Sequence, residues 1–116
     1  MAPVIQEPGR LKRRAEFLRV AAKGRKAPVH GLVLQALARD DDEPARLGFT
    51  VTRKVGNAVV RNRTRRRLKE AARLLLKDLP LSGVDLVLIG RDGTRGRSFS
   101  ALRDDFAKAL KRTGVA

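Results

Sequence analysis

The sequence predicts a single α+β domain with helices and strands in the order α-β-β-α-β-α. Residues 46–54 alternate apolar and polar side chains, as a half-buried strand does. Residues 58–79 form the longest stretch with helical spacing, and residues 84–89 form an apolar run typical of a buried central strand. At 116 residues the chain has the usual length of one domain, so we expect one sheet with helices packed mainly on one face.

The first element is a helix. Residues 1–9 carry two prolines and no periodicity, and we expect a flexible tail there. A helix over residues 10–22 is predicted by apolar residues at helical spacing, namely Leu11, Ala15, Leu18 and Ala22. Gly24 follows as the residue expected to end it. We expect the folded domain to span residues 10–112, with a second tail over 113–116.

Two strands are predicted next, over residues 29–39 and 46–54. The polar connector between them, residues 40–45, suits an antiparallel hairpin. The strand at 46–54, the helix at 58–79 and the strand at 84–89 make a β-α-β unit that is compatible with parallel pairing. The general rule for such units predicts a right-handed crossover.

The chain closes with a loop and a helix. Residues 90–96 are rich in glycine and charge, which is typical of a loop. Ser98 is placed to cap a last helix. Its apolar stripe consists of Phe99, Leu102, Phe106 and Leu110.

The charge balance indicates a polyanionic partner. The 27 Lys and Arg residues face 12 Asp and Glu residues, which gives a net charge of +15. A soluble domain needs only a few charges for solubility, so this excess predicts nucleic-acid binding. No run of 18 apolar residues is present, and with no cysteine and a single histidine a zinc site is untenable. We therefore expect a cytoplasmic protein with no membrane partner.

The positive charge is concentrated in residues 53–73, which hold nine basic residues and one acid. On a helical wheel the stretch has an inner stripe of Val60, Thr64, Leu68, Ala71, Ala72 and Leu75. An outer row comprises Arg61, Arg65, Lys69 and Arg73, with Asn62 and Arg66 beside it. Like charges four residues apart destabilise an isolated helix, whereas phosphates alongside turn them into binding energy. RNA is favoured over DNA because the order of elements provides neither a helix-turn-helix nor a zipper.

Residues 48–66 resemble the signature of the bacterial ribonuclease P protein family. The most specific part is Arg61-Asn62-Arg63, which the further basic cluster Arg65-Arg66 follows and the turn Lys54-Val55-Gly56-Asn57-Ala58 precedes. Weaker similarity covers about residues 10–112 and includes Arg10-Leu11-Lys12 and Phe17.

This resemblance implies an α-β sandwich whose β-α-β crossover is left-handed, in place of the right-handed crossover of the general rule. It implies a protein subunit that binds the catalytic ribonuclease P RNA, in a 1:1 complex, and the 5′ leader of precursor tRNA. The holoenzyme then removes the leader to generate the mature tRNA 5′ end. The resemblance assigns catalysis to the RNA subunit, and Mg²⁺ is expected to be bound mainly by that RNA and by the substrate.

The candidate site residues follow from the motif and from the basic stretch. The RNA-binding candidates are Arg53, Lys54, Asn57, Arg61, Asn62, Arg63, Arg65, Arg66, Lys69 and Arg73. The resemblance places Phe17 and Gln35 in a leader cleft between the sheet and the first helix, although ordinary core packing explains Phe17 equally well. Ala21 and Gln35 stand where some relatives have aromatic residues, so leader recognition is expected to depend more on charge and hydrogen bonding. No catalytic or metal-binding residue is expected in the protein.

Two other functions remain open at this point. The alternatives are a ribosomal or general structural RNA-binding protein and an autonomous nuclease. A nuclease needs convergent acids, bases or metal ligands. Glu70 is the one acid of the basic stretch 53–73, and we expect it to pair with Arg66 or Arg73.

Overall fold

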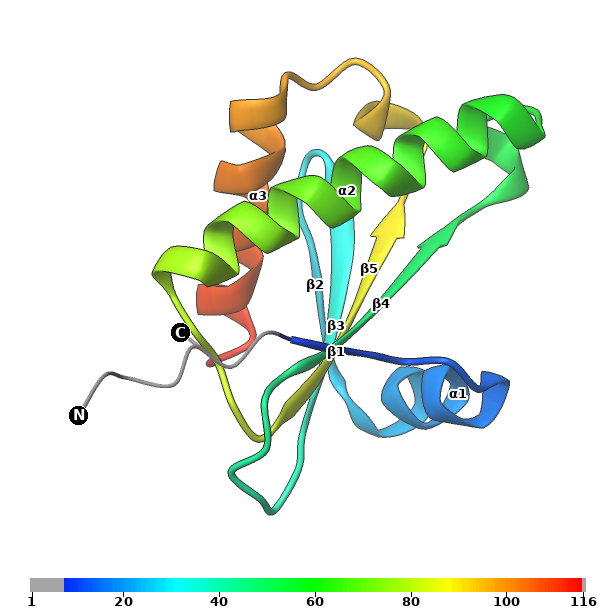
Figure 1. Ribbon diagram of the computed structural model, residues 1–116. Helices are drawn as coiled ribbons and strands as arrows, with labels where there is room; N and C mark the ends of the chain where they lie inside the picture. Colours follow the sequence, from blue (N-terminus) through cyan, green and yellow to red (C-terminus); the bar gives the residue numbers. More distant parts are fainter. Residues whose placement is uncertain (1–7, 116) are drawn as a thin grey trace.

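The computed structural model describes residues 8–115 and contains three helices and one mixed five-stranded sheet (Figure 1). The strands are β1 (Gly9–Arg10), β2 (Arg25–Pro28), β3 (Leu32–Ala38), β4 (Arg46–Val51) and β5 (Val84–Gly90). The helices are α1 (Arg14–Lys23), α2 (Ala58–Asp78) and α3 (Phe99–Arg112), with short 3-10 helices η1 (Arg53–Val55) and η2 (Asp92–Thr94). The predicted α+β class is confirmed.

The apolar strand β5 lies at the centre of the sheet, as predicted. The strand order is β1-β4-β5-β3-β2. β5 pairs parallel to β4 and antiparallel to β3, and all its residues are buried except the half-buried Ile89. β1 adds to the sheet parallel to β4, and β2 pairs antiparallel to β3. The parallel pairing of the strands around α2 is therefore confirmed.

The predicted hairpin between residues 29–39 and 46–54 is wrong. β3 and β4 do not pair, because β5 lies between them and pairs with both. A strand with apolar side chains on both faces gains the most free energy from burial when helices cover both faces and other strands pair with both edges. This favours the central position in the sheet. The predicted strand at 29–39 corresponds to β3, which begins only at Leu32 after a turn at His30 and Gly31. An additional strand that was not predicted, β2, precedes this turn and forms the hairpin with β3.

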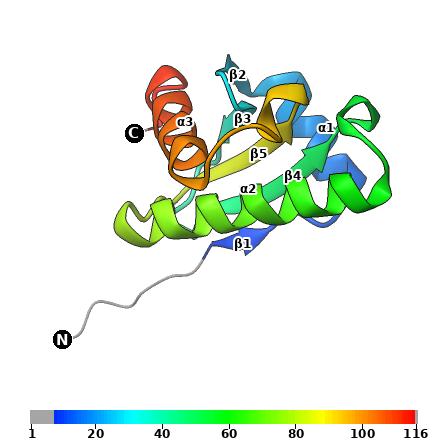
Figure 2. The same cartoon turned by 90° about the horizontal axis from the view of Figure 1, so that it is seen from above.

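The helices cover both faces of the sheet. α2 and α3 lie on one face and α1 on the other, so the expectation of helices mainly on one face holds for two of the three (Figures 1 and 2). The main core lies between the sheet and the α2–α3 pair. Its fully buried side chains include Leu32, Leu34, Leu68, Leu86, Leu88, Leu102, Phe106 and Leu110. A smaller cluster of Leu11, Val20 and Val87 lies on the α1 side.

Most predicted helix boundaries hold. α1 begins at Arg14 rather than at residue 10 and ends at Lys23, and α2 ends at Asp78 before Pro80. Ser98 caps α3, since its hydroxyl accepts a hydrogen bond of 3.1 Å from the backbone N–H of Ala101.

The expected tails are only partly covered by the structure. Residues 1–7 and 116 lie outside the described residues, while Gly9 lies in β1. Thr113 is buried and Val115 packs against the core, so the packed chain continues past residue 112.

A buried carboxylate ties several elements together on the α1 face. Asp85 of β5 is 2% exposed, and its Oδ1 accepts hydrogen bonds from Arg39 Nη1 at 2.6 Å and Arg46 Nε at 2.8 Å. Its Oδ2 accepts from Arg46 Nη2 at 2.7 Å. Burial by itself raises the pKa of Asp85, but hydrogen bonds and charge from Arg46 and Arg39 outweigh it and hold the pKa below its ordinary value. Asp85 is therefore ionised at neutral pH.

Replacing this carboxylate should cost stability in a pH-dependent way. Asp85→Asn leaves two guanidinium groups without their anion, so we expect the free energy of unfolding at pH 7 to fall by about 3–5 kcal/mol. A carboxylate with a lowered folded-state pKa stabilises fully above its unfolded value of about 3.9 and loses that contribution as the pH falls through the folded pKa. The difference between wild type and variant should thus shrink from pH 7 to pH 3 in urea unfolding. An equal difference at both pH values would contradict the assignment, and the exposed Asp104→Asn is the control.

Candidate nucleic-acid interface

The basic motif begins at the turn from β4 into α2. Asn57 is the N-cap of α2, and its Oδ1 accepts a hydrogen bond of 3.0 Å from the backbone N–H of Val60. Gly56 precedes it with little space for a side chain, since a Cβ there would lie 2.9 Å from Val60 Cγ1. These contacts fix where the helix starts, and so fix the direction in which each later basic residue points.

The predicted inner and outer faces of α2 are both present. Thr64, Leu68, Ala71, Ala72 and Leu76 are buried against the sheet and α3. The outward candidates are exposed: Asn57, Asn62, Arg63, Arg66, Lys69 and Arg73. Arg61 and Arg65 lie at the border and are half-buried. Arg53 and Lys54 of η1 are exposed just before the helix.

Several of these cations are not used by the fold. Within residues 8–115, no hydrogen bond or ion pair involves the side chains of Arg53, Lys54, Arg63, Arg66 and Lys69. The neighbouring groups do have partners: Arg65 donates to Asn62 Oδ1 at 2.9 Å, and Arg73 pairs with Glu70. The predicted pairing of Glu70 within the helix is confirmed for Arg73. A row of unneutralised charge on one helix face is the pattern expected of a phosphate-binding surface.

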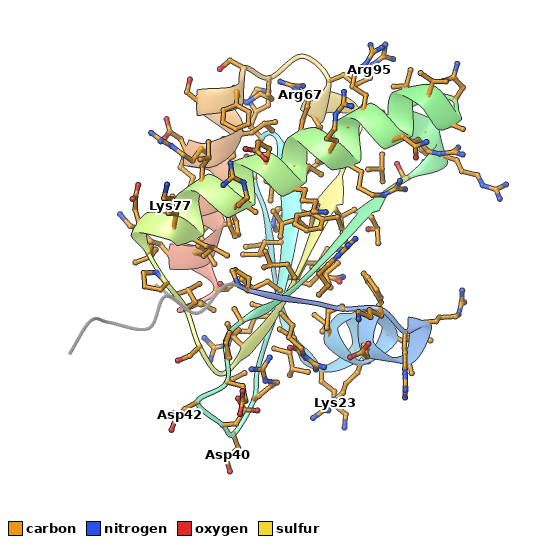
Figure 3. All side chains as sticks on the ribbon, in the orientation of Figure 1. Lys23, Asp40, Asp42, Arg67, Lys77 and Arg95 are labelled. Atoms are coloured by element: carbon orange, nitrogen blue, oxygen red, sulfur yellow. The ribbon has the colours of Figure 1, made fainter. Side chains whose placement is uncertain are left out.

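One arginine of the basic stretch has a different position. Arg67 points toward the loop before α3, where it donates to the carbonyls of Thr94 at 3.3 Å and of Arg97 (Figure 3). Thr94 is itself buried, and its hydroxyl donates to Gly31 O at 2.6 Å. Arg67 thus holds the 94–97 loop against α2 and is not available on the outer face.

A hollow of about 600 Å³ lies where β4 and β5 end. Thr52 and Lys54 follow β4, and Arg91 and Asp92 follow β5. The turn between β2 and β3 supplies the remaining wall, with Val29 and His30. Of the predicted RNA-binding residues, the structure places Lys54 here rather than on α2. Arg91 and His30 were not among the predicted residues, because they come from segments distant in the sequence.

The two predicted leader-cleft residues share the α1 face of the sheet. Phe17 is half-buried and packs with Leu11, Val20 and Val87, and a side chain on Gly48 of β4 would overlap its ring. Gly48, Val87 and Gln35 lie in register across β4, β5 and β3. Phe17 therefore takes part in the packing of α1, and the half-buried Gln35 lies further along the same face.

A second basic surface was not singled out from the sequence. Residues 10–26 hold eight basic residues and one acid, Glu16. The eight are all exposed: Arg10, Lys12, Arg13, Arg14, Arg19, Lys23, Arg25 and Lys26. Their density alone could have revealed the surface, but they are spread over two strands and a helix and follow no single period.

Two further kinds of site are absent from the described residues. No helix within residues 8–115 is long and apolar enough to cross a membrane. Nor does this part of the chain bring three or more His, Cys, Asp or Glu side chains together in a way that suits a metal ion.

Comparison with known proteins decides the family. The family model described as ribonuclease P matches residues 5–114. The chain belongs to the ribonuclease P protein family. It is 70% identical to the ribonuclease P protein component of Gluconacetobacter diazotrophicus over 91% of each chain. Among solved structures it resembles the RNase P protein of Thermotoga maritima, with a TM-score of 0.75 and 30% identity over 89% of this chain and 96% of that one. The Staphylococcus aureus RNase P protein gives a TM-score of 0.75 and 27% identity over 91% and 95%.

The chain is thus the protein component of the ribonuclease P holoenzyme, an endoribonuclease that processes the 5′ leaders of precursor tRNA. The chain is RNA-binding and acts in tRNA processing as part of a ribonucleoprotein. This membership implies association with ribonuclease P RNA and with precursor tRNA. It decides against the ribosomal or general structural alternative.

The cap at Asn57 gives a way to separate structure from recognition. Asn57→Ala should lower the free energy of unfolding by about 1 kcal/mol, whereas Asn57→Ser keeps a capping oxygen and should stay within a few tenths. Both variants lack the amide, so both should bind ribonuclease P RNA more weakly if the amide contacts RNA. Urea unfolding and filter binding measure the two effects. Wild-type RNA affinity in Asn57→Ser would show that Asn57 acts as a cap alone.

Proposed function

We propose that the outer face of α2 and the preceding η1 bind the ribonuclease P RNA. The proposed contacts are Arg53, Lys54, Asn57, Arg61, Asn62, Arg63, Arg65, Arg66, Lys69 and Arg73. The observation that supports this most is the set of five cations without a partner in the described chain. A guanidinium that the fold leaves free can grip two phosphate oxygens at once.

We propose that the 5′ leader of precursor tRNA lies across the α1 face of the sheet, beside Phe17 and Gln35. Next to the row of Gly48, Val87 and Gln35, the half-buried residues Thr50, Ile89 and Val33 form a parallel row nearer the carboxyl end of β5. This row leads toward the hollow that holds Lys54 and Arg91. An extended strand of RNA on this path meets a partly apolar floor and basic groups at its end, which suits bases and phosphates.

Catalysis in this proposal belongs to the RNA subunit, and the protein binds and orients. The RNA subunit and the substrate would hold most of the Mg²⁺, which would activate the attacking water. We propose a 1:1 complex with the RNA, formed in the cytoplasm through one RNA-binding domain that spans residues 10–112 and also includes the neighbouring packed residues Gly9, Thr113 and Val115. We also propose that the β4–α2–β5 crossover is left-handed, as the family resemblance implies; a crystal structure tests this directly.

The deciding experiment is cleavage of precursor tRNA by a bacterial ribonuclease P RNA at low magnesium, with and without the protein. We expect the RNA alone to be inactive, the mixture to be active, and the protein alone to cut nothing. Binding of RNA without any effect on cleavage would overturn the proposal in favour of a general RNA-binding role. Cleavage by the protein alone, lost on mutation of Glu70 or of the acids at 40–43, would instead indicate an autonomous nuclease.

The leader assignment predicts a selective effect at Phe17. Phe17→Ala should weaken binding of leader-bearing precursor by roughly fivefold or more, because a stacked base contributes about 1–3 kcal/mol. Binding of mature tRNA should change little. Phe99→Ala is a matched control, since Phe99 is also half-buried but packs on the opposite side of the sheet. An equal loss for precursor and mature tRNA would place Phe17 in the core alone.

A further inference from the structure

Glu16 connects α1 both to its own first turn and to the sheet. Its Oε1 accepts hydrogen bonds from the backbone N–H groups of Lys12 at 3.0 Å and Arg13 at 2.8 Å. Its Oε2 accepts from Arg46 Nη1 of β4 at 2.7 Å. The two oxygens thus have separate tasks: one caps the helix, and the other attaches it to the sheet. Hydrogen bonds from the Arg13 and Lys12 backbone, with the charge of Arg46, keep the pKa of Glu16 below its usual value.

Arg46 is a rigid partner because the buried Asp85 holds it from behind. Nε and Nη2 of Arg46 form a two-pronged contact with Asp85 at 2.8 and 2.7 Å, which leaves Nη1 directed at Glu16. Arg39 Nη1 donates to Oδ1 of Asp85 at 2.6 Å, the same oxygen that accepts from Arg46 Nε, and Arg39 Nε contacts Asp41 at 3.0 Å. A guanidinium held in two places on a buried carboxylate has little rotamer freedom left to lose when it binds a third group.

The apolar contact that holds α1 on the sheet is small. Val20 is the one fully buried residue of this ten-residue helix, and Phe17 is half-buried beside it. The helix is also basic, and Glu16 is its single acid. Because its apolar contact is small and Arg46 repels its positive charge, α1 needs a specific polar contact to fix its position on the sheet.

We propose that Glu16 and Arg46 are positioning residues for the leader: their contact sets where α1 lies over the sheet, and so where Phe17 and the basic side chains of α1 meet the leader. This inference rests on the proposed leader path. Neither residue has to touch RNA, because Arg46 has Nε, Nη1 and Nη2 engaged and Glu16 is an anion. Loss of the contact therefore weakens leader binding and leaves the α2 surface unchanged.

Glu16→Gln isolates this contact. The amide oxygen of Gln can still accept from the backbone of Lys12 and Arg13, while its NH₂ group now faces a guanidinium that can only donate. The buried Asp85 keeps both arginines, so the variant should fold. Asp104→Asn is the matched control, because it changes the net charge equally at an exposed acid of α3. Arg46→Lys is the second variant, since one ammonium can pair with Asp85 but lacks the fork that bridges both acids.

The measurement is the ratio of holoenzyme affinities for precursor tRNA with its leader and for mature tRNA, with affinity for the RNA subunit measured separately. We expect Glu16→Gln and Arg46→Lys each to lower the ratio roughly two- to fivefold, as for a partly exposed ion pair. The double variant should lower it no further than either single one. RNA-subunit affinity and the Asp104→Asn ratio should stay at wild-type values.

Each other result overturns the proposal. A wild-type ratio in both single variants would show that the contact does not position the leader site. An equal fall in Asp104→Asn would indicate a general charge effect, additive losses would show that the residues act separately, and a parallel fall in RNA-subunit affinity would indicate general structural damage. If the wild-type holoenzyme itself does not distinguish precursor from mature tRNA, the leader path fails, and that failure is visible before any variant is compared.

Discussion

The structure depends on one strand that is buried on both faces. β5 places Leu86 and Leu88 under α2 and α3, and Val87 under α1, so it belongs to both hydrophobic clusters. It also pairs with β3 along its whole length and with β4 from Asp85 to Gly90, so it separates the two faces while it joins all the layers. The α2 surface and the α1 surface therefore lie on opposite sides of one sheet (Figure 2). Under the proposed assignment, the ribonuclease P RNA and the 5′ leader would therefore contact different side chains.

Asp85, the single charged residue of β5, imposes a related constraint. Asp85 is on the α1 face, beside Arg46 of β4. A lone buried carboxylate would be costly, but two arginines satisfy its oxygens, and one of them, Arg46, also bridges Asp85 to Glu16 of α1. Such a network adds little net stability compared with apolar packing. Its value lies in geometry, because a two-pronged guanidinium contact fixes direction as well as distance.

The sequence predicted local features well and long-range ones poorly. The cap at Ser98, the end of α2 and the inner stripe of that helix follow from residues within a few positions of one another, and they are present. The apolar run at 84–89 predicted a central strand, but its neighbours β3 and β4 are set by pairing between residues about 40 to 60 positions apart, which local patterns do not determine. β1 has two residues and carries no periodic signal. The Glu16–Arg46–Asp85 contact joins three distant segments and was equally invisible.

Neighbouring residues of the basic stretch in α2 also have different roles, which the sequence alone does not reveal. Arg66 and Arg67 are chemically identical neighbours, yet Arg66 is exposed without a partner in the described chain, while Arg67 binds loop carbonyls and is half-buried. A helix turns by about 100° per residue, so a motif of consecutive arginines necessarily divides between the solvent and the fold. The acids are divided too: Glu16, Asp85 and Asp105 are paired internally, while Asp40 and Asp42 lie on a loop far from α2 (Figure 3). The paired acids leave the outer face of α2 with an excess of positive charge, and this field attracts a polyanion before any contact forms.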